Sequence, residues 1–166
     1  MRMTAEKYEK MTERLRRNPQ AVSCIGKLNQ ALTAATYAAY AVLLISQAAQ
    51  KNALFWKVLL VPAAGFAGVT IFRKLYNAPR PCEVLDIEPL LARRKKGESF
   101  PSRHVFSIFM IAMACLQAWT WVGVLFFGFG VLLAWTRVIG GVHFPRDVIA
   151  GALIAAAWGI VGFYVL

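Results

Sequence analysis

The chain has 166 residues, 58% of them hydrophobic, and carries 19 lysines and arginines against 8 acidic residues. A soluble domain is usually about 45–50% apolar, and here the excess lies in long runs that can each cross a bilayer. The composition therefore excludes an ordinary soluble domain and indicates an integral membrane protein. The formal net charge of +11 suits anionic headgroups and phosphates, and no nucleic-acid-binding motif is visible.

Residues 4–17 predict an amphipathic helix that is too charged to cross a membrane. Its less polar positions share one helical face: Thr4, Tyr8, Met11 and Leu15. Such a helix lies in the membrane interface, and Asn18-Pro19 is expected to end it. We assign residues 1–27 to a basic amphipathic N-terminal segment and residues 28–166 to a transmembrane catalytic domain.

Five apolar runs follow and predict five membrane-spanning helices. Their approximate limits are 28–49, 53–72, 105–119, 122–135 and 148–166. The third run is short but can extend in both directions, and the fourth can continue to Val142. The expected fold is an all-α integral membrane helical bundle with about five transmembrane helices plus the N-terminal interfacial helix.

Basic residues collect at one end of this bundle. An odd number of spans brings segments 73–104 and 136–147 to the same membrane face as the N-terminal helix. Of the 19 lysines and arginines, only Lys51 and Lys57 fall at the other face. Because positive residues favour the cytoplasm, we predict a multi-pass cell-membrane protein whose polar end faces the cytosol. The basic run 93–96 is interpreted as an anchor.

The chain has two histidines, and both lie at this polar end. His143 is four residues before Asp147, which places both on one helical face if a helix begins here. A neutral imidazole can attack phosphorus when a carboxylate holds its tautomer. A second imidazole must then protonate the leaving oxygen, and His104 is available.

Several arginines and a serine near the histidines can bind a phosphoryl group. Guanidinium donors form a planar fork that fits phosphate oxygens, and hydroxyl or backbone donors at a helix start can add to them. The candidate phosphate-binding residues are Arg73, Lys74, Arg80, Ser102, Arg103 and Arg137. The three cysteines show no metal-ligand spacing, and we expect neither a metal nor another cofactor.

Three motifs resemble those of the type 2 phosphatidic acid phosphatase (PAP2) superfamily. That family shows Lys-x6-Arg-Pro, Pro-Ser-Gly-His and Ser-Arg-x5-His-x3-Asp, in this order. The chain shows Arg73-x6-Arg80-Pro81, Pro101-Ser102-Arg103-His104 and Thr136-Arg137-x5-His143-x3-Asp147. Order, spacing and membrane placement agree throughout this region.

The resemblance implies a role for each matched position and no need for a metal. His143 would be the nucleophile that forms a phosphohistidine, Asp147 would orient it, and His104 would be the general acid. The phosphoryl group would be bound by Arg80, Ser102 and Arg137.

The chain departs from the family pattern at three positions. Arg73 keeps the spacing and charge of the first motif's lysine, with Lys74 as the alternative. Thr136 keeps the hydroxyl of the third motif's serine. Arg103 replaces the glycine of the second motif, and it either adds a phosphate contact or points outward to a headgroup.

These features predict a metal-independent phosphatase acting on a lipid phosphate monoester: phosphatidate, phosphatidylglycerol phosphate or a prenyl-linked phosphate. A prenyl diphosphate phosphatase and a lipid phosphotransferase with the same site are alternatives. A non-enzymatic membrane scaffold or lipid transporter is a further alternative. The expected partners are the bilayer and a phosphorylated membrane lipid, without nucleic acid, and the oligomeric state is left open.

Overall fold

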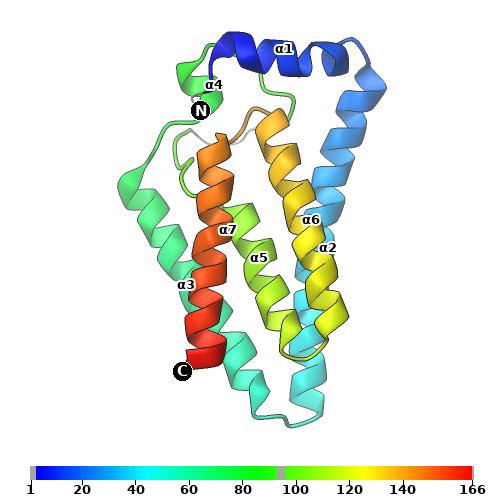
Figure 1. Ribbon diagram of the computed structural model, residues 1–166, viewed down its shortest axis with the longest axis vertical. Coiled ribbons are helices and arrows are strands. Elements are labelled where there is room, and N and C mark those ends of the chain that lie inside the picture. The colour runs from blue at the N-terminus through cyan, green and yellow to red at the C-terminus, as the bar shows by residue number, and fades with distance from the viewer. Residues whose placement is uncertain (1–2, 93–95, 166) are drawn as a thin grey trace.

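The computed structural model describes residues 3–92 and 96–165, and every regular element in these residues is a helix. The helices are α1 (Ala5–Arg16), α2 (Pro19–Ala49), α3 (Leu54–Tyr76), α4 (Pro81–Val84), α5 (Arg103–Leu116), α6 (Thr120–Ile139) and α7 (Pro145–Ile160), with α7 continuing as a π-helical turn (Val161–Val165). Figure 1 shows the long helices side by side, with α1 across one end and the two termini at opposite ends. The all-α membrane bundle is confirmed.

Four helices, α2, α3, α6 and α7 with its π turn, are each long and apolar enough to cross a membrane. Their outward faces carry large apolar side chains such as Ile45, Leu75 and Leu153, each more than half exposed. Such faces suit contact with lipid tails. The protein is therefore a multi-pass membrane protein. The helix that contains the first predicted span, 28–49, begins earlier, at Pro19, where Asn18 caps it.

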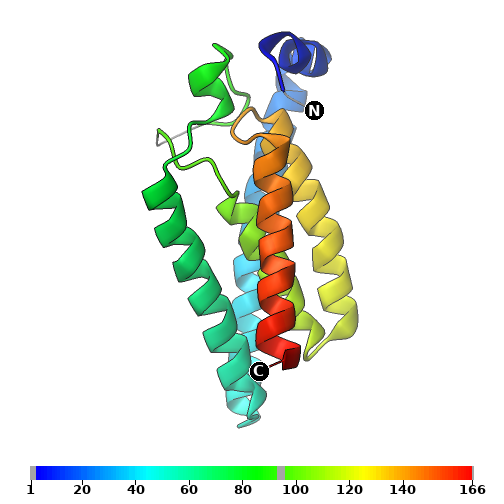
Figure 2. The same cartoon turned by 60° about the vertical axis from the view of Figure 1, so that its left-hand side comes forward.

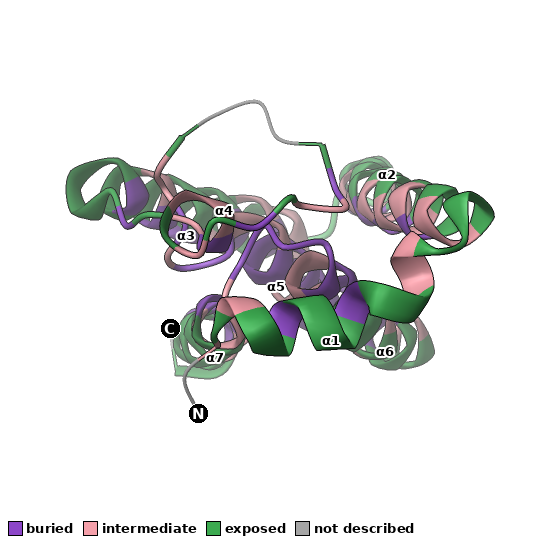
Figure 3. Cartoon of the chain, turned by 90° about the horizontal axis from the view of Figure 1, so that it is seen from above, coloured by how far each residue is buried: buried purple, intermediate pink, exposed green. Residues whose placement is uncertain are grey.

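The remaining predicted span, α5, is a helix of only 14 residues, or about 21 Å at 1.5 Å per residue. Most of its side chains are buried, because it packs against α2, α3, α6 and α7. Seen from above, it lies in the middle of the bundle (Figure 3). Because neighbouring helices surround α5, it does not need the length of a helix that faces lipid across the whole bilayer.

Helix α3 leans away from α7 toward the polar end of the molecule (Figures 1 and 2). The chain between α3 and α5 bridges the resulting space, and it contains α4 and the second motif. The basic run predicted at 93–96 lies outside the described residues except for Lys96. This connection brings loop residues close to the starts of α5 and α7.

The amphipathic helix α1 lies over the polar end and buries Tyr8 and Thr12, whereas Met11 is 38% exposed. Tyr8 packs against Gly141, whose φ of +71° suits glycine and whose Cβ position would lie 2.5 Å from the tyrosine hydroxyl. Arg16 of the same helix donates to the backbone carbonyl of Glu88. These contacts connect α1 to the loops beneath it.

Candidate active site

The three predicted motifs meet at the polar end of the bundle. They lie at the end of α3, the start of α5, the end of α6 and the start of α7. These ends meet because successive helices run in opposite directions, so that the end of one and the start of the next lie at the same end of the bundle (Figure 1). Segments far apart in the sequence therefore form one cluster.

His143 and Asp147 form a buried pair at the start of α7. The imidazole Nδ1 lies 3.6 Å from the carboxylate Oδ2, and both side chains are at most 1% exposed. Asp147 is in the first turn of α7, where Oδ2 also accepts a hydrogen bond of 3.0 Å from the backbone N–H of Phe144. This cap fixes the carboxylate. Because Nδ1 faces Asp147, Nε2 is the ring nitrogen available for a substrate.

Ser99 is a member of this cluster that the sequence reasoning missed. Its hydroxyl donates to Asp147 Oδ2 at 2.5 Å and lies 3.5 Å from His143 Nδ1, and the residue is fully buried. It precedes the second motif by two positions and belongs to none of the three motifs. The only sequence signal was its closeness to Pro101.

The loop that carries His143 is held by backbone contacts from two motif arginines. Arg80 Nη1 donates to the carbonyl of Val142 at 3.1 Å, and its Nε donates to the carbonyl of Gly97 at 2.8 Å. The backbone carbonyl of Arg137 accepts hydrogen bonds from the N–H groups of Val142 and His143, both at 3.3 Å. The loop therefore has a defined conformation before any ligand binds.

Arg73 is buried, and Lys74 is on the exposed side of α3. Arg73 Nη1 donates to the backbone carbonyls of Ser99 and Pro101. The structure thus brings Arg73, rather than Lys74, to the segment that leads into α5. This contact positions Ser99 and the second motif.

Helix α7 and the start of α5 are in direct backbone contact. The N–H of Ser102 donates to the carbonyl of Asp147 at 2.8 Å. Gly151 allows this approach, because a Cβ at this position would lie 2.7 Å from the Ser102 carbonyl oxygen. The second and third motifs are therefore parts of one site.

Several buried polar atoms of the site have no hydrogen-bond partner within residues 3–92 and 96–165. They include Arg73 Nε, Ser102 Oγ and Arg137 Nε, which can all donate. Arg137 does use Nη1, which donates to Asn29 Oδ1 of α2 at 3.3 Å. Buried donors without acceptors are costly. Donors on three converging elements suit an anionic ligand such as a phosphoryl group.

His104 and Arg103 lie side by side in the sequence but face different neighbours. His104 borders a small hollow with Ser107 and Leu133, and no hydrogen bond reaches its ring in the described part of the chain. Its imidazole is close enough to interact electrostatically with Arg137 and His143. The guanidinium carbon of Arg103 lies 5.5 Å from the ring centre of Phe66 on α3.

Burial lowers the pKa of His143 below its usual value. The hydrogen-bonding carboxylate of Asp147 opposes this change, and the positive charges of Arg137 and Arg80 add to it. The imidazole is therefore neutral at physiological pH and keeps the lone pair that a nucleophile needs. The side chain of Arg146 is 70% exposed, and its Nε lies 3.6 Å from Asp147 Oδ1.

Metal-ligating side chains do not gather in threes anywhere in the described ranges 3–92 and 96–165. The positive charge at the site comes from arginine side chains. Guanidinium groups can neutralise the negative charge of phosphoryl oxygens, as bound metal cations do in other proteins.

A sequence model of the PAP2 superfamily matches residues 54–166. The putative undecaprenyl-diphosphatase YbjG of Escherichia coli (strain K12) is 45% identical over 58 residues, which cover 34% of this chain and 29% of that protein. The lipid A 4'-phosphatase of Bacteroides thetaiotaomicron is 31% identical over 75 residues, which cover 44% of this chain and 33% of that protein. The matches thus span only a minor part of these relatives.

Two crystal structures share the fold along most of their length. Aquifex aeolicus LpxE superimposes with a TM-score of 0.74 at 23% identity, covering 98% of this chain and 95% of that chain. A transmembrane PAP2 type phosphatidylglycerolphosphate phosphatase from Bacillus subtilis gives a TM-score of 0.65 at 20% identity, covering 95% and 83%. At such identities the likeness concerns the arrangement of the helices.

Proposed function

The chain belongs to the PAP2 superfamily, and from this premise we propose that it is a metal-independent phosphatase of a phosphorylated membrane lipid. The observation that carries the proposal is the buried His143–Asp147 pair beside donors that lack acceptors. The names of the two partly matched relatives, a putative undecaprenyl-diphosphatase and a lipid A 4'-phosphatase, support a lipid phosphate as substrate.

In the proposed first step, Nε2 of neutral His143 attacks the phosphorus atom of a phosphate monoester. The bond between phosphorus and the ester oxygen breaks, and a phosphohistidine forms. Asp147 holds Nδ1–H and stabilises the positive charge that develops on the ring. The hydroxyl of Ser99 holds Asp147 in turn, through the 2.5 Å hydrogen bond.

The phosphoryl oxygens gain negative charge in the transition state and need fixed donors. Arg80, Arg137 and Ser102 supply them in this proposal, together with the positive charge of Arg73. Hydrogen bonds hold them before substrate arrives: Arg80 donates to the Val142 carbonyl, Arg137 to Oδ1 of Asn29, and the Ser102 N–H to the Asp147 carbonyl. Such preorganisation lowers the barrier because little rearrangement is needed during the reaction.

His104 is the proposed general acid. It protonates the leaving ester oxygen, and the dephosphorylated lipid departs. Water then attacks the phosphohistidine, His104 accepts a proton from it, and inorganic phosphate is released. The electrostatic contact between His104 and His143 supports a position on the leaving-group side of the same site.

The test is phosphate release by the purified protein from a panel of lipid phosphates in the presence of EDTA. The panel contains phosphatidate, phosphatidylglycerol phosphate and a prenyl phosphate. We expect turnover with at least one of them, inhibition by vanadate, and a loss of about 1000-fold or more in His143→Ala. Full activity of this variant would contradict the mechanism. Phosphoryl transfer to an added alcohol, in place of phosphate release, would identify a phosphotransferase.

The cytosolic orientation of the site is also a proposal, supported by the charge difference between the two ends. It is tested in a variant in which Asp86, an exposed residue of the polar end, is replaced by the only cysteine. A membrane-impermeant maleimide should label this variant in permeabilised cells and leave it unlabelled in intact cells. Labelling of intact cells would place the polar end outside.

A further inference from the structure

Arg103 at the start of α5 is a half-buried cation without a carboxylate partner in the described part of the chain. Its guanidinium stacks over the aromatic ring of Phe66. It interacts electrostatically with Arg73 and His104. These neighbours do not compensate its charge. A half-buried charge at the edge of a membrane bundle is costly unless an anion compensates it.

An apolar groove of about 310 Å³ lies between α2, α3 and α5. We call it the α2–α3 groove. Phe106, Ser107 and Met110 form its wall on α5, and they share a helical face with Arg103 because they follow it by three, four and seven positions. Phe66 belongs both to this groove and to the stacked pair. Arg103 therefore lies at the polar mouth of the groove.

The α2–α3 groove also leads to the general acid. Tyr37 and Ser107 line the groove and, at the same time, the small hollow against His104. A lipid whose hydrocarbon chain lies in the groove therefore has its polar end near His104 and Arg103. The part of the lipid directly before the scissile phosphate then lies beside Arg103.

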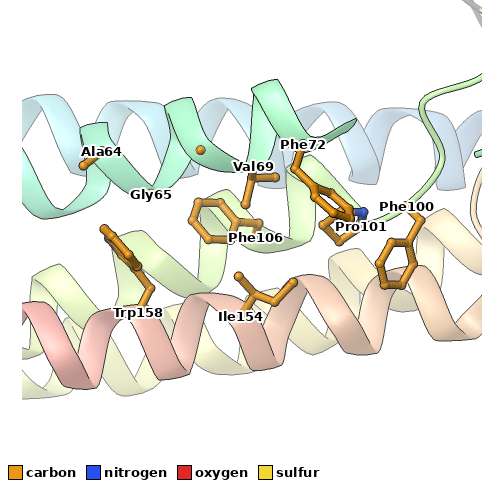
Figure 4. Close-up of a pocket in the computed structure, with 10 residues that line it drawn as sticks. Ala64, Gly65, Val69, Phe72, Phe100, Pro101, Phe106, Ile154 and Trp158 are labelled. Carbon is orange, nitrogen blue, oxygen red and sulfur yellow. The ribbon is translucent and has the colours of Figure 1, made fainter. Parts of the chain in front are cut away.

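A second apolar groove of about 310 Å³ lies on the other side of α3, between α3, α5 and α7 (Figure 4). Phe100 and Pro101 line it toward the polar end, whereas Phe66, the ring under Arg103, lines only the α2–α3 groove among the described residues. Arg73 donates to the Pro101 carbonyl behind this wall. The two grooves therefore differ in what stands at their polar ends.

We propose that Arg103, supported by Phe66, forms a second anion subsite that binds a phosphoryl group on the hydrocarbon side of the scissile phosphate. The preferred substrate is then a lipid diphosphate rather than a lipid monophosphate. This inference rests on the proposed function and specifies its substrate class. A guanidinium that is stacked on an aromatic ring keeps its in-plane N–H donors free for such a phosphoryl group.

The reaction with a diphosphate balances in the same way as that with a monoester. His143 Nε2 forms a bond with the terminal phosphorus, and the bond from this phosphorus to the bridging oxygen breaks. The bond electrons remain on the bridging oxygen, so a lipid monophosphate leaves with increased negative charge beside Arg103. Water then releases inorganic phosphate from the phosphohistidine.

The experiment compares kcat/KM for a prenyl monophosphate and a prenyl diphosphate of the same chain length. Wild-type protein, Arg103→Ala and Arg103→Lys are measured in the same detergent. We expect wild type to prefer the diphosphate, and Arg103→Ala to lower this preference about tenfold or more, since a charge-assisted hydrogen bond is lost. Arg103→Lys should restore part of it. Phe66→Leu, which removes the stacking surface, should lower the preference by a smaller factor.

Arg14→Ala is the matched control, because it removes an arginine on the exposed side of α1. It should keep the wild-type preference. If Arg103→Ala lowers both kcat/KM values equally, Arg103 acts on the scissile phosphate and the second subsite is wrong. If wild type turns over lipid monophosphates with an unchanged ratio in Arg103→Ala, only this inference fails. If wild type releases phosphate from no lipid phosphate, the proposed function fails.

Discussion

The two histidines lie in regions that differ in how many of their polar groups are hydrogen-bonded. Around His143, the carboxylate of Asp147, the hydroxyl of Ser99 and the backbone of the Gly140–Phe144 loop are all held by hydrogen bonds. Around His104, the neighbouring Ser102 hydroxyl has no acceptor, and no hydrogen bond reaches the imidazole in the described residues. The first region is organised in advance, and the second has unsatisfied groups that a ligand can use.

This difference agrees with the two proposed roles. A nucleophile needs one tautomer and one direction of attack, which the buried carboxylate provides. A general acid has to reach the leaving oxygen, which only the bound substrate positions. Changes around His143 and around His104 should therefore affect catalysis to different degrees.

Asp147→Asn should cause the largest loss, about 1000-fold in kcat. The amide no longer stabilises the imidazolium and permits the wrong tautomer of His143. The loss is measured as phosphate release at saturating substrate. Asp86→Asn, at an exposed position, is the matched control and should retain activity. A loss below about tenfold would mean that the pair does not orient the nucleophile.

His104→Asn should lower kcat about 100-fold with an alkyl phosphate, the scale of general acid catalysis. With an aryl phosphate, whose leaving oxygen needs little protonation, the loss should be only about tenfold. The two substrates are compared with the same preparation of the variant. Equal losses would show that His104 does not protonate the leaving group.

Ser99→Ala should lower kcat about tenfold and leave KM nearly unchanged. The variant removes the donor to Asp147 Oδ2, and residues that orient a reacting group through another residue contribute on this scale. Ser46→Ala is the control, because Ser46 Oγ donates within α2, toward the other end of the bundle. A KM increase at constant kcat would instead indicate a binding role.

The smallest expected effect is on the pH dependence of kcat/KM at mildly acidic pH. A free imidazole takes up a proton near pH 6.5, but burial lowers the pKa of His143. The neutral nucleophile therefore persists as pH falls through 6.5, and the acid limb of kcat/KM should lie below this value. The measurement is a pH profile with Asp147→Asn for comparison. An acid limb at or above 6.5 would contradict the assigned environment.

The sequence predicted the residues of the site that lie in motifs, and it missed residues whose partners are far away in the chain. His104, Arg80, Arg137, His143 and Asp147 were predicted from motif spacing, and the structure brings them to one end of the bundle. Ser99 and Asn29 were missed, because their partners are 48 and 108 positions away in the chain. Local spacing carries no information about contacts at such separations.

The sequence by itself determined the helical membrane class, the common end of the motifs and the four-residue spacing of His143 and Asp147. Apolar run length and helical periodicity are local properties, so they can be derived without coordinates. The tertiary structure decided that α5 is central, that Arg73 points inward in place of Lys74, and that Arg103 stacks on Phe66. These features depend on how separate helices pack, and packing determines which neighbour a side chain meets.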